Sequence, residues 1–485
     1  MADSISTSKV TAATKRLQDA LQERYQATSG ILREGSRIII PAHMSWRDAA
    51  EAILSHAKKQ EEDVQTLSEF NCHPHDGLVA LVRAIKSKFG ELIGAESESM
   101  FGKIPGRTYT VPISFTETIV VPIGDAEIPG VPIKMDIRPQ FADMDNESAS
   151  NDLGGMLTVI FSYKRMYEPL VKDIEAEIRL QLEQNSIFRG KAIDSRFNFM
   201  NVDTFDPNRV VYSRNEKRTI DANILAPIVN TKAWLQSGSQ LRRGILLYGE
   251  YGTGKTLTAL LTGQNCVKHG WTFINVLPGD DINRALRFAK RYEPAVVFFE
   301  DIDNDTKGDR NEHINNILNT IDGVISKSAK VITILTTNHI QKISRGMLRP
   351  GRLDSIIEMG KLDREAIIKL VRVAGTGEDG VSIVEGPLDE DAICEAAKGY
   401  MPAYISEAVT KAKAYALTRE TNDGNLTITS DDIVSALIEL REQYNLMRSD
   451  QVVKEPDVDS SIGHIVQMAI APMAKELSDI TKRIS

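Results

Sequence analysis

Residues 244–256 read GILLYGEYGTGKT, an apolar run followed by a glycine-rich turn and the pair Lys255-Thr256. The apolar run predicts a buried strand, and the leucines after the turn predict a helix. Glycines let backbone N–H groups point inward without a Cβ in the way, and a helix N-terminus favours anionic phosphate. This stretch therefore predicts a phosphate-binding loop between a strand and a helix.

The loop supplies most of the candidate nucleotide ligands. Lys255 would place a point charge at the β- and γ-phosphates of ATP, and the hydroxyl of Thr256 would bind Mg²⁺. A glycine-rich turn can match by accident, but the flanking strand and helix argue against that alternative. The candidates are Gly249, Gly252, Thr253, Gly254, Lys255, Thr256 and Leu257.

Two acids, Glu300 and Asp301, follow the apolar run at 296–299. Ligands of open α/β sheets bind at the carboxyl ends of the strands, where these acids would lie. One acid would hold Mg²⁺ and the next would orient or deprotonate the attacking water. Taken alone, the pair fits two solvated acids at a strand end better; the upstream phosphate loop favours the catalytic interpretation.

Three further polar residues fit a nucleotide site. Asn338 ends the apolar strand at 331–336, where its amide can bridge the attacking water and the γ-phosphate. Arg349 and Arg352 bracket a Pro-Gly turn, and arginine suits transition-state phosphate charge because its planar fork is always protonated. The alternative for the arginines is a basic surface loop.

Alternating strands and helices from 208 to 362 predict an α/β core with a parallel sheet. The expected strands are 244–248, 272–276, 295–299, 331–336 and 355–359. Residues 363–447 read as a helical lid, and 448–485 as a linker with a C-terminal helix.

The N-terminal half has a different character. Residues 1–35 are polar and read as flexible, and 188–207 read as a connector. Between them, 36–187 predict an α+β domain that binds a protein substrate or adaptor. Within it, 46–93 read as helical, whereas 103–163 are rich in β-branched residues and turns, which predicts short strands.

Composition and charge bear on the partner, the membrane association and the compartment of the protein. The 485 residues carry a formal net charge of -9 and a pI of about 5.6, which argues against nucleic acid as a partner. The sequence contains no run of 18 or more uncharged apolar residues, so we expect no membrane-spanning helix. Three widely separated cysteines argue against disulfides and for the cytoplasm; they are Cys72, Cys266 and Cys394.

The segment CHPH at 72–75 contains three possible metal ligands. Its spacing fits no common zinc pattern, and a loop that caps a helix explains it better.

The AAA ATPase family is the one that this chain resembles, on four motifs in the same order: GILLYGEYGTGKT, NNILNTIDGV at 315–324, TTN at 336–338 and LRPGRLD at 348–354. The resemblance covers about residues 208–445. It implies an α/β P-loop core with a five-stranded parallel sheet, a helical lid and a homo-oligomeric ring, usually a hexamer.

The resemblance also implies roles for single residues. Arg349 and Arg352 align with the arginine fingers that act on a neighbour's ATP, and Asn338 aligns with the first sensor. GYMPA at 399–403 resembles the lid segment near the nucleotide, which makes Ala403 a candidate ligand. ATP and Mg²⁺ are the implied cofactors.

Two departures from the family pattern matter. The usual Asp-Glu order is inverted, so Glu300 would bind Mg²⁺ and Asp301 would act on the water. The loop at 276–283 lacks the aromatic residue of peptide-threading motors. Both features are similar to those of a mitochondrial AAA translocase that moves a folded iron–sulfur protein, and SIFRGKAI at 186–193 resembles a connector of bacterial and phage AAA proteins.

We therefore expect an ATP-hydrolysing, chaperone-like ring that remodels proteins. One alternative is a nucleotide-switched scaffold with slow hydrolysis, which the short Asp301 favours. A second is a DNA-associated ATPase, against which the acidic balance counts.

Overall fold

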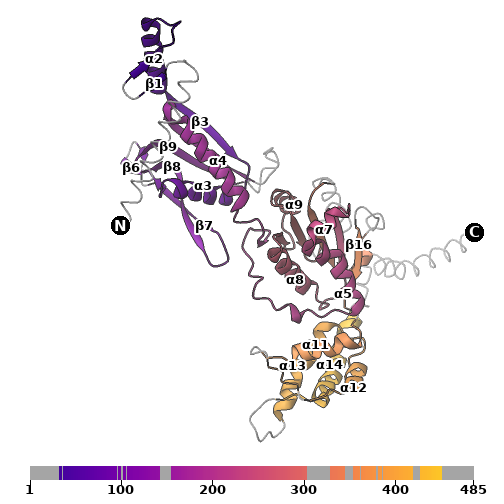
Figure 1. Cartoon of the computed structure of the whole chain (residues 1–485). Coiled ribbons are helices and arrows are strands. Elements are labelled where there is room, and N and C mark those ends of the chain that lie inside the picture. The colour runs from indigo at the N-terminus through magenta and orange to yellow at the C-terminus, as the bar shows by residue number, and fades with distance from the viewer. Residues whose placement is uncertain are drawn as a thin grey trace, which may run out of the picture. The chain divides into compact units, whose positions relative to one another are not determined.

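The computed structural model describes residues 32–34, 37–95, 97–99, 102–104, 106–141, 155–302, 328–343, 353–360, 362–377, 381–384, 386–418 and 427–450 (Figure 1). They form two compact units. The first comprises the described residues within Met1–Phe205, Arg218–Tyr248 and Lys255–Ile357. The second comprises those within Asp206–Lys217, Gly249–Gly254 and Glu358–Ser485. Among the described helices, none has the length and apolarity needed to cross a membrane.

The N-terminal part of the first unit is built on a six-stranded antiparallel sheet. Its order is β3-β10-β9-β8-β4, with β7 pairing to β8. The strands are β3 (Asp63–Phe70), β4 (Ile93–Gly94), β7 (Arg107–Pro112), β8 (Thr118–Ile128), β9 (Val131–Phe141) and β10 (Gly155–Lys164). The β-rich stretch expected from the sequence is therefore present in the sheet.

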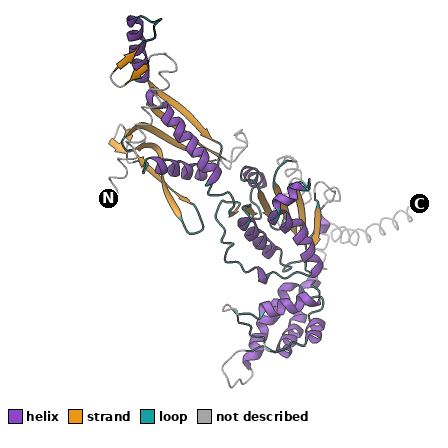
Figure 2. Cartoon of the chain, viewed as in Figure 1, coloured by secondary structure: helices purple, strands orange, loops and turns teal. Residues whose placement is uncertain are grey.

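Helices α3 (Pro74–Lys88) and α4 (Glu168–Gln184) pack on each other and on one face of this sheet. Alternation along the strands sends Phe70, Val159 and Ile137 into the shared core, since successive side chains point to opposite faces. Figure 2 shows these helices in purple beside the orange strands. Smaller elements complete this part: β1 (Leu32–Glu34), β2 (Arg37–Ile39), α2 (Trp46–Gln60), β5 (Ser97–Ser99), β6 (Gly102–Ile104) and η1 (Arg165–Tyr167).

The expectation of continuous helix over 46–93 is wrong, because β3 separates α2 from α3. The strand reads DVQTLSEF, and its burial alternates so that Ser68 and Phe70 are buried while Leu67 and Glu69 are exposed. Its buried positions include serine, so its period of two is weak in hydrophobicity alone. Tertiary pairing with β10 decides the conformation of this segment.

The segment 72–75 forms the start of α3. His73 is the N-cap, and its Nδ1 accepts a hydrogen bond from the backbone N–H of His75 at 3.3 Å. The helix-cap interpretation of this segment is thereby confirmed. The ring of His73 is buried among aromatic side chains, including Phe188 and Phe197.

The second large sheet of the first unit has the order β11-β13-β14-β15-β12-β16. All five expected strands are present, and β11 from the connector adds a sixth by pairing in parallel with β13. The bounds are β11 (Ala192–Asp194), β12 (Arg243–Tyr248), β13 (Thr272–Val276), β14 (Ala295–Phe299), β15 (Val331–Thr337) and β16 (Ser355–Glu358).

Helices α8 (Lys255–Lys268) and α9 (Ile282–Arg291) cover opposite faces of this sheet. Gly263 of α8 lies against the ring of Phe273, whereas Leu286 of α9 joins the cluster of Ile274 and Val276. Neighbouring strand residues point to opposite faces, which places the two helices on either side. Short helical elements precede β12 or follow β15: η2 (Pro207–Arg209), α5 (Arg214–Ile220), η3 (Asp221–Leu225), α6 (Ala226–Val229), α7 (Thr231–Gln236) and η4 (Ile340–Lys342).

The second unit is mainly a helical lid with its own apolar core. Val371, Val409 and Leu437 belong to this core, each from a different helix. The helices are α11 (Arg364–Ala374), α12 (Glu390–Ala396), α13 (Pro402–Thr418) and α14 (Ser430–Asp450).

The buried His73 predicts how stability depends on pH. Burial lowers the pKa of His73 well below its usual 6.5, and His75, Arg284 and Arg291 lower it further. As pH falls, the unfolded chain binds this proton first, so stability is present above pH 6.5 and is lost below it. The loss is at most about 1.4 kcal/mol per pH unit. Replacing His73 with Gln should flatten the change in the urea midpoint between pH 7.5 and 5.5.

The same measurement on the exposed His43→Gln variant is the control. An unaltered pH slope in His73→Gln would show that His73 does not titrate as its burial requires.

Candidate functional site

The carboxyl ends of three strands meet at one edge of the parallel sheet. Tyr248 of β12 is in register with Thr337 of β15, and Phe299 of β14 with Leu335 of β15. Along the chain, β12 is followed by β13, β14 and β15, which all lie on one side of β12, whereas β16 lies on its other side. The strand order therefore reverses between β12 and β15. Such a switch point is where ligands bind in open α/β sheets.

At this point the first residue of α8 meets the end of β15. The Nζ of Lys255 donates a hydrogen bond to Oδ1 of Asn338 at 2.7 Å. The Nδ2 of Asn338 in turn donates to Oδ1 of Asp301 at 3.2 Å. Three of the predicted site residues are thus joined by hydrogen bonds, although Lys255 begins α8 whereas Asn338 and Asp301 follow the ends of β15 and β14. Lys255 is 8% exposed, so its charge is largely screened from water.

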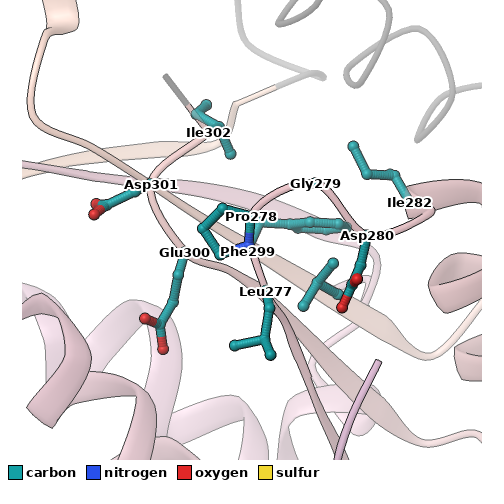
Figure 3. A pocket seen from close by; sticks show the side chains of 10 residues that line it. Leu277, Pro278, Gly279, Asp280, Ile282, Phe299, Glu300, Asp301 and Ile302 are labelled. Carbon is teal, nitrogen blue, oxygen red and sulfur yellow. The ribbon is translucent and has the colours of Figure 1, made fainter. Parts of the chain in front are cut away.

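The two acids separate from each other. Glu300 and Asp301 point in different directions from the end of β14 (Figure 3). Glu300 turns toward β13, where Nδ2 of Asn275 donates to its Oε1 at 3.1 Å. Asp301 turns toward β15 and Asn338. The inverted acid order therefore places the shorter carboxylate, not the longer one, beside the Lys255–Asn338 pair.

The backbone explains the separation. The N–H of Glu300 donates to the carbonyl of Val276 on β13, whereas that of Ile302 donates to the carbonyl of Thr336 on β15. Between them, Asp301 adopts a φ of +44°, and its N–H donates to Oγ1 of Thr336 at 2.8 Å. A non-glycine residue at positive φ costs about 1–2 kcal/mol. Such strain persists where surrounding contacts hold it, and it clusters at functional sites.

A small cavity of about 20 Å³ lies beside the acid pair (Figure 3). It is lined by the loop after β13, from Leu277 to Asp280, and by 299–302. Its volume suits about one water molecule rather than a nucleotide. The loop after β13 and the acid pair therefore line the same cavity.

The glycine-rich loop Gly249–Gly254 belongs to the second unit, together with the lid. Gly252 has a φ of +77°, and its carbonyl accepts a hydrogen bond from the N–H of Ala403 at 3.0 Å. A Cβ on Gly252 would lie 2.6 Å from Cβ of Ala403. Loop residue Thr253 is buried, and its Oγ1 donates to the carbonyl of Glu250. The loop thus contacts the lid residue that the sequence marked as a candidate ligand.

The structure describes some of the remaining candidate residues and not others. Thr256 and Leu257 lie exposed in the first turn of α8, which Lys255 begins. Gly249 and Gly254 are the first and last residues of the loop, and Gly254 has a φ of +94°. Arg349 and Arg352 lie outside the described residues.

Sequence reasoning missed Asn275. It is the one strongly polar side chain in the buried strand TFINV, and that contrast was the available signal. Its Oδ1 is buried and has no hydrogen-bond partner among the described residues. Asn275 therefore orients Glu300 and leaves one acceptor in reserve beside the acid pair.

The comparison with protein families decides the identity of this fold. Residues 245–361 match the family described as "ATPase family associated with various cellular activities (AAA)". This region is an AAA domain. The matched residues contain Lys255, both acids and Asn338, so the AAA motif and the observed line of contacts coincide.

Curated relatives agree with this assignment. The chain is 26% identical over 270 residues to a 26S proteasome regulatory subunit S10B homolog of Arabidopsis thaliana, covering 50% of this chain and 65% of the relative. It is 30% identical over 161 residues to the ATP-dependent zinc metalloprotease FtsH 2 of Thermoanaerobacter, covering 30% of this chain and 31% of the relative. It is 31% identical over 171 residues to the peroxisomal ATPase PEX6 of Kluyveromyces lactis, covering 31% and 17%. These matches span less than two thirds of each relative's length.

The contact between Gly252 and Ala403 predicts a selective effect on nucleotide affinity. Gly252→Ala adds a Cβ at positive φ against Ala403, which should weaken ATP binding by about tenfold or more, equivalent to about 1.4 kcal/mol. Isothermal titration with ATP and Mg²⁺ measures this.

Gly238→Ala is the matched control, because Gly238 has the same φ of +77° with nothing within 4 Å of the added Cβ. It should lose stability through backbone strain and retain native ATP affinity. Equal affinity loss in both variants would mean that the lid contact is irrelevant to binding.

Proposed function

We propose that the chain is an ATP-binding and ATP-hydrolysing AAA motor that remodels proteins in the cytoplasm. The observation that carries this proposal is the line Lys255–Asn338–Asp301 at the strand switch point. The phosphate-loop motif precedes Lys255 directly in the chain. A buried ammonium, an amide and a carboxylate so arranged can respectively bind phosphate, sense it and act on water.

The residues fit the chemistry of ATP with Mg²⁺. Mg²⁺ prefers hard oxygen ligands, and the hydroxyl of Thr256 and the carboxylate of Glu300 are of that kind. When bound, the metal ion would neutralise the charge that develops on the phosphate oxygens. The ammonium of Lys255 would exchange its contact with Asn338 for the phosphates. The loop glycines Gly249, Gly252 and Gly254 would expose backbone N–H groups to them.

Asp301 would orient the attacking water and accept its proton. Asn338 bonds Asp301 in this structure, which fixes the carboxylate where the amide can also reach the water. Positioning and electrostatics supply most of the catalysis in phosphoryl transfer. The strained backbone of Asp301 supports this role, because it holds a short side chain next to Asn338.

The sequence motif and the relatives support a homo-oligomeric ring, as a hexamer. Arg349 and Arg352 would complete a neighbour's site, since arginine suits the transition-state charge. Two of the relatives carry ATP dependence or ATPase activity in their names, and another is a proteasome regulatory subunit. Residues 36–187 would then bind the protein substrate or an adaptor.

A nucleotide-switched scaffold is the second candidate, and the contact between Asn275 and Glu300 favours it. While that contact lasts, Glu300 is turned toward β13, away from the Asp301–Asn338 pair. A protein that keeps this arrangement would bind ATP and turn it over slowly.

Lys255→Ala tests the binding site. Loss of the ammonium should reduce ATP affinity by at least about a hundredfold, because charge-assisted bonds to phosphate are the strong ones. Fluorescence titration with an ATP analogue measures it. The exposed Lys268→Ala, at the other end of α8, should bind normally. Normal hydrolysis by purified Lys255→Ala protein would refute the site.

Asp301→Asn separates motor from scaffold. If Asp301 acts on the water, the variant should bind ATP like the native chain and release phosphate at least about a hundredfold more slowly. The exposed Asp203→Asn serves as the control. Native protein that binds ATP yet releases no measurable phosphate, with or without substrate, favours the scaffold instead.

A further inference from the structure

The N-terminal domain and the AAA core meet at a buried carboxylate. Asp76 lies in the first turn of α3, and its Oδ2 accepts hydrogen bonds from Oγ of Ser186 at 2.7 Å and from Oη of Tyr292 at 3.0 Å. Its Oδ1 accepts one from the N–H of Ile187 at 2.9 Å. Asp76 is 2% exposed, so these donors replace the water that its charge would otherwise need.

The hydroxyl of Tyr292 takes part in two hydrogen bonds to the N-terminal domain. Its hydroxyl donates to Asp76 and accepts a hydrogen bond from the N–H of His73 at 3.2 Å. The neighbouring Arg291 donates to Oδ1 of Asn71 at 2.7 Å. All three partners belong to the start of α3 or the residues just before it. The C-terminal end of α9 is therefore bonded directly to the N-terminal domain.

The other end of α9 reaches the acid pair. Asp281 caps the helix, and the preceding loop, through Asp280, lines the small cavity that Glu300 and Asp301 also line (Figure 3). Asp280 accepts a hydrogen bond from Oγ of Ser195, whose N–H donates to the carbonyl of Asn275. Asn275 is the residue that holds Glu300. The helix thus spans the distance between the nucleotide acids and Asp76.

The helix is suited to transmit a displacement. Its ten residues span about 15 Å. Four of them are buried, among them Leu286 and Phe288, and the guanidinium of Arg284 lies over the ring of Phe197 at 4.4 Å. A packed helix moves as a body rather than bending gradually, because protein interiors are dense.

We propose that α9 couples the nucleotide site to the N-terminal domain through the Tyr292–Asp76 contact. Rearrangement of Glu300 when nucleotide binds would shift the loop after β13, and α9 would carry that shift to the start of α3. By thermodynamic reciprocity, a partner that displaces α3 would change the affinity for nucleotide. The inference rests on the proposed function, since it concerns regulation of that same ATP site.

Packing of the N-terminal domain against the AAA core does not by itself require the Tyr292–Asp76 hydrogen bond. Phe188, Phe288 and the Tyr292 ring already pack against one another at the junction. Hydrogen bonds to a buried carboxylate are directional, whereas apolar packing is not. The bond to Asp76 therefore favours one position of Tyr292 relative to α3. Such a contact can be made or lost as a unit when α9 moves.

Hydrogen exchange tests the coupling on the full chain. The probe is the non-hydrolysable analogue AMP-PNP with Mg²⁺, and the readout is exchange of the amides from residue 71 to residue 80. We expect saturating analogue to change these rates by at least about threefold in the native chain, as expected for a local opening linked to binding. Tyr292→Phe removes only the hydroxyl and should lose at least half of that response.

Tyr163→Phe is the matched control, because Tyr163 is also a buried tyrosine but lies in β10 of the N-terminal domain rather than at the end of α9. It should respond like the native chain. If Tyr292→Phe proves unstable, Ser186→Ala removes one other donor to Asp76 and should reduce the response in the same direction.

Analogue binding is measured in parallel by fluorescence. Native protein that binds the analogue without any change at residues 71–80, or a Tyr292→Phe response equal to the native one, overturns the coupling and leaves the ATP site intact. Absence of binding by the native chain overturns the proposed function itself, and the coupling with it.

Discussion

The parallel register of β12, β15 and β14 is the constraint on which the candidate site depends. It brings Lys255, Asn338 and Asp301 to one edge of the sheet, although 83 positions separate the first two residues. The hydrogen bonds that join them follow from that register. A shift of one residue in the register of any of these strands would turn the side chains at its end to the opposite face of the sheet, and these hydrogen bonds would be lost.

The backbone at the end of β14 then decides what each acid does. Backbone bonds to both neighbouring strands turn Glu300 toward Asn275 and Asp301 toward Asn338. The inverted order of the acids is therefore more than an exchange of side-chain length. It places the shorter carboxylate beside Asn338, at a residue whose backbone has a positive φ.

Much of the core could be predicted from the sequence because its signals are local. Each expected strand of the sheet is a mainly apolar run, four of the five are followed directly by a polar or glycine residue, and the observed bounds differ by one residue at most. The loop 249–254 carries its own conformational requirement in glycines such as Gly252 and Gly254. Asn338 and the two acids were found because strand ends attract ligands.

The remainder depends on contacts that no local pattern encodes. β3 was missed because its buried face includes Ser68 and its pairing partner β10 lies far along the chain. The short β11 owes its existence to pairing with β13. Asp76 and Tyr292 are separated by 216 positions, and neither stands in a motif. Asn275 was hidden for the same reason, since its meaning comes from Glu300 across the strand pair.

The central claim is that one nucleotide site contains Lys255, Asn338 and Asp301. Cryo-EM of the Asp301→Asn chain with ATP and Mg²⁺ tests it most directly. We expect density for the γ-phosphate within hydrogen-bond distance of the Lys255 ammonium and of the Asn338 amide, with Mg²⁺ beside Thr256 and Glu300. Nucleotide density at any other place, or a Lys255–Asn338 bond unchanged by bound ATP, would contradict it.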